Sequence, residues 1–116
     1  MNINALNEVD LFYIRLKNGW VSPKEKKMLY ELVINLNNRT NCQKERFILF
    51  YNLKQEQTEK YNYTSLGKIQ NCSGSAIKYS ISRIKNALAN LDEERKKIFL
   101  DIVKHNDYFK NKPKKV

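Results

Sequence analysis

Apolar residues recur along the chain at steps of three and four, which is the spacing of one face of an α-helix. No segment shows the strict alternation of apolar and polar residues that a half-buried strand needs. The pattern therefore predicts an all-α fold. The expected helices run over about Asn4–Lys17, Ser22–Leu36, Cys42–Leu53, Thr64–Gln70, Ser73–Asn90 and Asp92–Asn106.

Local signals mark the start of the second helix. Ser22 can cap it, Pro23 fits the first helical position, and Glu25 can close a capping box. The stretch 54–62 has no apolar period and is expected to form a loop. His105 stands near the end of the last helix, where we expect it to face the negative end of the helix dipole.

The chain has 116 residues, so we expect a single domain, a multi-helix domain built around a helix-turn-helix. Its predicted parts are an N-terminal helical hairpin over residues 1–40, a helix-turn-helix over 42–91 and a C-terminal helix within 92–109. The basic tail 110–116 is expected to be disordered. The outer helices are more apolar than the central part needs, so they either complete the core of the monomer or pair two subunits in a homodimer.

The net charge of +10 is high for this length and favours nucleic acid or an anionic surface as partner. No apolar run approaches the roughly 18 residues of a membrane span, and the N-terminus lacks the pattern of a signal peptide. We therefore expect a cytoplasmic protein with no membrane partner. Its two cysteines, Cys42 and Cys72, are expected to be buried and reduced.

The charge is unevenly distributed, and the segment Tyr61–Leu91 contains no acidic residue. A short helix, a turn and a longer helix are predicted there, so all the charge on their exposed faces is positive. Such a unit is suited to contact a DNA duplex. The basic residues from position 60 to 91 are Lys60, Lys68, Lys78, Arg83 and Lys85.

The predicted turn has suitable residues for a close crossing of its two helices. Gly67 is expected on the inner face, Asn71 tolerates a left-handed backbone, and Cys72 is a small apolar plug. Ser73 can cap the second helix. Gln70 fits less well, because an apolar residue is expected there.

The second helix of this unit has one apolar stripe, formed by Ile77, Ile81, Ile84 and Leu88. Burial of the stripe would turn Ser75, Lys78, Tyr79, Ser82 and Asn86 outward. The first half of such a helix can enter the major groove, where Ser75, Lys78, Tyr79 and Ser82 are candidates for base or phosphate contacts. Candidates for phosphate contacts alone are Lys68, Arg83, Lys85 and the free N–H groups around Ser73.

The segment Ser73–Leu88 (SGSAIKYSISRIKNAL) resembles the second half of region 4 of bacterial sigma factors, which follows S-x-x-T-V-K-x-R-L-x-R-A-x-x-x-L. Glu45–Tyr51 (ERFILFY) is similar to the helix that precedes this motif. Small phage and plasmid transcription regulators have similar sequences. The loop 54–63 is longer than in that family, and the first 40 residues are too short for region 2, the part that melts a promoter. The resemblance therefore implies a free-standing region 4-like DNA-binding protein, which in that family also contacts RNA polymerase.

The leading hypothesis is a sequence-specific double-stranded DNA-binding protein, a transcription regulator or sigma-like factor. One alternative is a module that docks on RNA polymerase or another regulator. Another is a DNA-processing accessory factor of a phage or plasmid. Lys78 and Tyr79 can also belong to a merely solvated face. The chain has no phosphate-binding glycine loop, no catalytic constellation and no metal-ligand spacing, so we expect neither an enzyme nor a cofactor.

Overall fold

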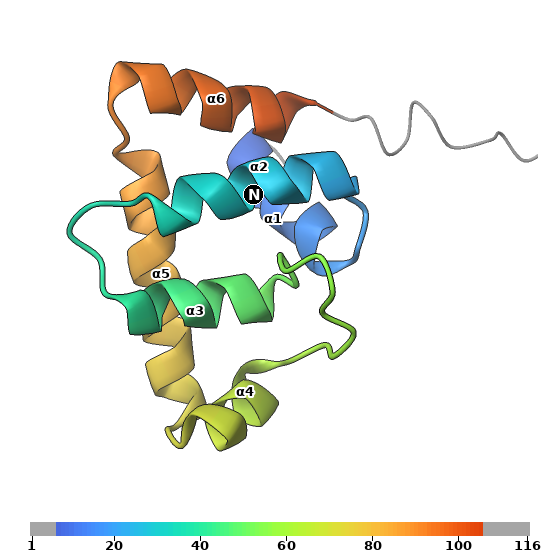
Figure 1. Cartoon of the computed structure of the whole chain (residues 1–116), viewed down its shortest axis with the longest axis vertical. Coiled ribbons are helices and arrows are strands. Elements are labelled where there is room, and N and C mark those ends of the chain that lie inside the picture. Colours follow the sequence, from blue (N-terminus) through green and yellow to red (C-terminus); the bar gives the residue numbers. More distant parts are fainter. Residues whose placement is uncertain (1–6, 106–116) are drawn as a thin grey trace, which may run out of the picture.

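A computed structural model describes residues 7–105, and within this range the chain forms helices and no strand (Figure 1). The predicted all-α class is confirmed. Figure 1 shows α5 along the length of the molecule, with α3 crossing it, α4 at one end and α6 at the other. The helices are α1 (Glu8–Lys17), α2 (Pro23–Ile34), α3 (Asn41–Phe50), α4 (Tyr63–Gln70), α5 (Gly74–Ala89) and α6 (Glu93–Lys104).

The helix ends differ from the predicted ones by a few residues. Helix α1 begins at Glu8, because Asn7 has an extended backbone and its side chain accepts a hydrogen bond from the Asp10 amide at 2.9 Å. Helix α3 ends at Phe50, three residues before the predicted end. The predicted helix start at Asn4, the predicted end near Asn106 and the tail 110–116 lie outside the described residues.

The start of α2 is tied to the end of α6. The Ser22 side chain accepts a hydrogen bond from the Glu25 amide at 3.3 Å, and its hydroxyl donates to the Glu25 carboxylate. That carboxylate is buried and lies 2.7 Å from Nδ1 of His105. His105 therefore joins two helices by pairing with Glu25, a tertiary role that the sequence analysis did not anticipate.

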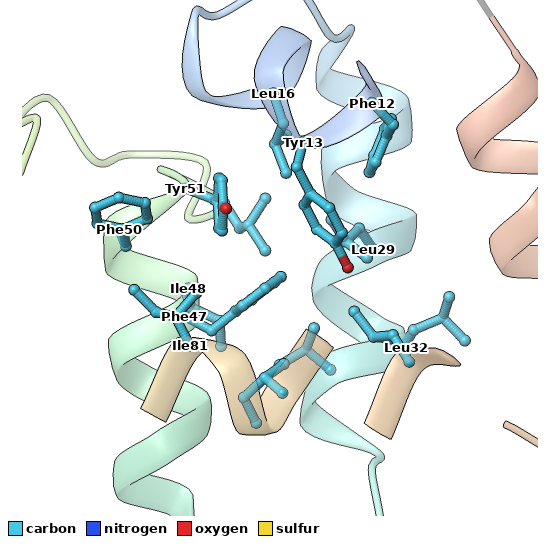
Figure 2. Packing of buried hydrophobic residues seen from close by; sticks show 14 of the residues in the cluster. Phe12, Tyr13, Leu16, Leu29, Leu32, Phe47, Ile48, Phe50, Tyr51 and Ile81 are labelled. Atoms are coloured by element: carbon cyan, nitrogen blue, oxygen red, sulfur yellow. The ribbon is translucent and has the colours of Figure 1, made fainter. Parts of the chain in front are cut away.

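The apolar core lies between α1, α2, α3 and α5, and aromatic rings form its centre. Figure 2 shows Tyr13 pointing from α1 into the space between α2 and α3. Its ring lies 6.1 Å from that of Phe47 and 5.5 Å from that of Tyr51, measured between centroids. The predicted stripe of α5 closes this core, since Ile77, Ile81, Ile84 and Leu88 are all buried.

Helices α1 and α6 complete the core of the monomer. The Phe12 ring of α1 meets the Phe99 ring of α6 edge to face, with centroids 6.3 Å apart. Ile102 and Val103 of α6 are also buried. Both outer helices thus contribute to the core of one chain, while Leu11 and Ile14 of α1 are exposed. Ile98, on the same helix as Ile102 and Val103, is exposed.

The predicted loop between α3 and α4 is present and is held at both ends. The Lys17 ammonium donates to the carbonyl of Phe50, where α3 ends, at 2.7 Å, and to that of Tyr61, before α4, at 2.5 Å. The rings of Phe50 and Tyr63 stack with centroids 4.7 Å apart. These contacts fix the position from which α4 starts.

Candidate nucleic-acid interface

Helices α4 and α5 are joined by the turn 71–73, which has the local geometry that its residues predict. Asn71 has φ 59° and ψ 46°, in the left-handed region. The Cys72 amide donates to the Gly67 carbonyl at 2.8 Å. The Ser73 side chain caps α5 by accepting a hydrogen bond from the Ala76 amide at 3.1 Å.

Gly67 is required for the close approach of the two helices. A Cβ atom at this position would lie 2.6 Å from the carbonyl oxygen of Cys72, well inside the van der Waals distance. Because the clashing atom is backbone, no side-chain rotation would relieve it. The predicted position of Gly67 on the inner face is confirmed.

The exposed side of α5 contains the residues that the stripe predicts. Ser75, Lys78, Tyr79 and Ser82 are all exposed, and Tyr79 is 61% exposed. We call these four residues the reading face. The burial of Ile77 and Ile81 on the other side of the helix holds this face toward solvent. Asn86, one helical turn after Ser82, is exposed as well.

A buried polar contact joins α3 to both helices of the unit. Ser80 of α5 is only 2% exposed, and its hydroxyl accepts a hydrogen bond from Nη1 of Arg46 at 2.9 Å. Nε of the same arginine is 3.4 Å from the Gln70 side-chain oxygen. This explains why a polar residue stands at position 70, where we expected an apolar one.

Lys85 does not lie where the sequence analysis expected a phosphate contact. Its ammonium group sits 4.5 Å from the centroid of the Tyr13 ring and 5.6 Å from that of Tyr51. Burial lowers the pKa of this lysine from its usual value, while Asp10 acts in the opposite direction. A cation held against aromatic faces is stabilised there. Lys85 therefore lies at the edge of the core and is not part of the candidate interface.

Arg83 stays on the flank of α5, and the structure adds Arg39 beside it. Nε of Arg39, from the connection between α2 and α3, donates to the backbone carbonyl of Arg83 at 3.0 Å. Nε of Arg83 is buried without a hydrogen-bond partner among the described residues. No sequence signal pointed to Arg39, because 44 positions separate it from its contact. Lys68, also a candidate, is exposed on α4.

Within residues 7–105, no group of three or more His, Cys, Asp or Glu side chains could hold a metal ion. In the same part of the chain, no helix has the length and apolar character to cross a bilayer. Cys42 is exposed and Cys72 is half-buried, so the expectation that both thiols are buried is wrong for Cys42.

No protein-family model, curated protein or solved structure matches this chain. The candidate interface therefore rests on geometry and charge. The structure gathers the reading face on one side of α5 and places Arg83 beside it. Ser73 stands at the start of the same helix, where its side chain is exposed and acts as the cap. Two of the predicted site residues are half-buried: Lys85 packs its ammonium group against core rings, and Nε of Arg83 is enclosed.

Proposed function

We propose that this chain is a sequence-specific double-stranded DNA-binding protein that places the first half of α5 in the major groove. The observation that carries the proposal is the exposed reading face on a helix unit without a single acidic residue. A duplex repels carboxylates and attracts lysine and arginine, so this charge pattern suits it. The width of the major groove matches one α-helix.

Each residue has a proposed role that follows from its chemistry. Lys78 donates to a guanine edge or a phosphate, and the ring of Tyr79 contacts a thymine methyl group. Ser75 and Ser82 can bond a base or a phosphate. On the flanks, Arg83 and Lys68 would hold phosphates, and Arg39 joins them because of its contact with the Arg83 backbone.

The proposed role in the cell is that of a transcription regulator or sigma-like factor. The resemblance of Ser73–Leu88 to sigma region 4 supports this choice. A DNA-processing accessory factor of a phage or plasmid would use the same contacts with the duplex. The position of the bound site in the genome separates the two roles, since a regulator binds beside a promoter.

Selection from a pool of random duplexes, followed by affinity measurements on variants, tests the proposal. We expect the pool to yield one preferred site. Lys78→Ala and Tyr79→Ala should each lower affinity for that site by roughly 5- to 150-fold, the value of about 1–3 kcal/mol for a base contact, and relax the preference. Arg83→Ala should weaken binding to all sequences alike and reduce the salt slope by about one.

Lys97→Ala is the matched control, because Lys97 is exposed on α6 and its loss changes the net charge by the same amount. It should leave the preference for the selected site unchanged. If Lys97→Ala and Lys78→Ala had equal effects at the selected site, α5 would not be the reading element. A symmetric selected site would also indicate that two copies bind together.

A second candidate function, docking on RNA polymerase or another regulator, is favoured by one observation. Ile69 of α4 and Tyr79 of α5 are large apolar side chains that are 56% and 61% exposed, and such residues are typical of protein contacts. Capture of RNA polymerase by a Lys78/Arg83 double alanine variant that no longer binds DNA, and that keeps Ile69 and Tyr79, would support docking. If Ile69→Ala lost both DNA binding and capture of RNA polymerase, the two partners would share one surface.

A further inference from the structure

A second basic site lies away from the reading face, in a cleft between α1, α2 and the connection from α3 to α4. The cleft has a volume of about 280 Å³. Three lysines from three different segments line it: Lys17 at the end of α1, Lys26 in α2 and Lys60 before α4. No lining residue is acidic.

Lys17 is fixed in the cleft, and its charge is not neutralised there. Its ammonium group donates to the carbonyls of Phe50 and Tyr61 and lies 3.6 Å from the centroid of the Phe50 ring. All three partners are uncharged. Two of its three N–H bonds go to these carbonyls, and its positive charge remains available to attract an anion.

Lys26 and Lys60 also lack a counter-charge. Within residues 7–105, no carboxylate lies within 4.0 Å of any of the three ammonium groups. Burial lowers the pKa of Lys17 and of Lys26, and the positive charge of Lys60 lowers both further. The cleft therefore concentrates positive potential in a partly enclosed space, which is the condition for binding an anion.

We infer that this cleft binds a phosphate group, held by the ammonium groups of Lys17, Lys26 and Lys60. Its volume, about 280 Å³, is near the lower limit of ligand pockets, about 300 Å³, and has ample room for a phosphate group. The phosphate comes either from a duplex backbone or from a small free ion such as phosphate or pyrophosphate. The cleft can bind a phosphate whether or not the reading face binds DNA, so the two proposals are tested separately.

The first arm of the test uses thermal unfolding of the full chain in sodium pyrophosphate and in sodium chloride of equal ionic strength. A free ion at tenfold excess over its Kd should raise the Tm by roughly 5 °C. In Lys26→Ala and Lys60→Ala, pyrophosphate should no longer raise the Tm by this amount. Lys24→Ala is the matched control, because Lys24 is exposed on α2 and does not line the cleft. Comparison with Lys24→Ala also separates specific binding from the general stabilisation that such salts give to folded proteins.

The second arm measures how the affinity for a duplex falls with salt concentration. If the cleft takes a backbone phosphate, Lys26→Ala and Lys60→Ala should each reduce the slope by about one, and Lys24→Ala should not. If the cleft variants change only the Tm increment, the site binds a free ion. If they change only the salt slope, the site binds a DNA phosphate. The inference is wrong if the cleft variants match Lys24→Ala in both arms. If the chain binds no duplex, the first arm decides alone.

Discussion

At the scale of single residues, Tyr13 places a polar atom inside an aromatic core, and this lowers the stability of the folded state. Its ring fills the space between Phe47 and Tyr51, but its hydroxyl is buried without a hydrogen-bond partner among the described residues. Burial raises the pKa of Tyr13 above its usual value, and the neighbouring Tyr51 and Asp10 raise it further. The ring stabilises the core, whereas the unpaired hydroxyl opposes folding.

We expect Tyr13→Phe to raise the free energy of unfolding by about 1–3 kcal/mol near neutral pH, because it removes an unpaired buried hydroxyl and keeps the ring. The gain should also grow with pH. Below pH 10.0 the tyrosine is protonated in both states; above it the unfolded chain loses the proton and the folded chain keeps it. Stability of the native protein therefore falls as pH rises through this range.

Urea unfolding of the native chain and of Tyr13→Phe at about pH 9 and pH 11 measures this effect. The difference in unfolding free energy between the two proteins should widen by about 1.4 kcal/mol. Tyr51, whose pKa is also raised mainly by burial, contributes to both proteins and cancels in the comparison. A constant difference across this range would mean that the Tyr13 hydroxyl is not confined in the core.

Single-residue roles were only partly predictable from the sequence. The apolar stripe of α5 correctly predicted the exposure of Ser75, Lys78, Tyr79 and Ser82, because an α-helix fixes opposite faces. It did not predict that Lys85, at the edge of the stripe, would turn its ammonium group toward Tyr13. Long lysine side chains can reach inward or outward from such positions, and tertiary partners decide between the two.

At the scale of elements, the connection between α4 and α5 was the most predictable part of the chain. Gly67, Asn71 and Ser73 each have a backbone or capping role that few other residues fill. Helix ends were less predictable. Helix α3 stops at Phe50 because Asn52 takes a left-handed backbone with φ 57°, which the apolar pattern through Leu53 concealed.

The two glycines of this unit give a matched pair of predictions of opposite sign. Gly67→Ala should lower the free energy of unfolding by about 1–3 kcal/mol, since its Cβ would meet the Cys72 carbonyl. Gly74→Ala should be neutral or raise it by up to about 1 kcal/mol, because the nearest atom is at an ordinary 3.5 Å and alanine favours the helix. Urea unfolding followed by circular dichroism measures both. Equal effects of the two substitutions would contradict the close crossing at Gly67.

At the scale of the whole molecule, long-range polar contacts hold the helices around α5. Arg46 links α3 to Ser80, Arg39 links the connection between α2 and α3 to Arg83, and Lys17 links α1 to Tyr61. These partners are 34–44 positions apart. Periodicity predicts which face of a helix is buried, but not which helix covers it, so neither Arg39 nor the lysine cleft could be found before the structure.

The same arrangement leaves the reading face and the lysine cleft on separate parts of one molecule. The reading face lies on α5, and the cleft lies between α1, α2 and the segment before α4. Phe50 lines the cleft, and its ring stacks on that of Tyr63, the first residue of α4. A phosphate bound in the cleft would thus lie beside the segment that sets the position of α4.

The most direct test of the account is the affinity of the purified chain for a labelled random-sequence duplex, measured by fluorescence anisotropy at about 50 mM salt and above. We predict a Kd between nanomolar and micromolar at the lowest salt, with the logarithm of affinity falling linearly and steeply as the logarithm of salt concentration rises. No binding at about 50 mM salt would contradict the claim that α5 is a DNA-reading helix.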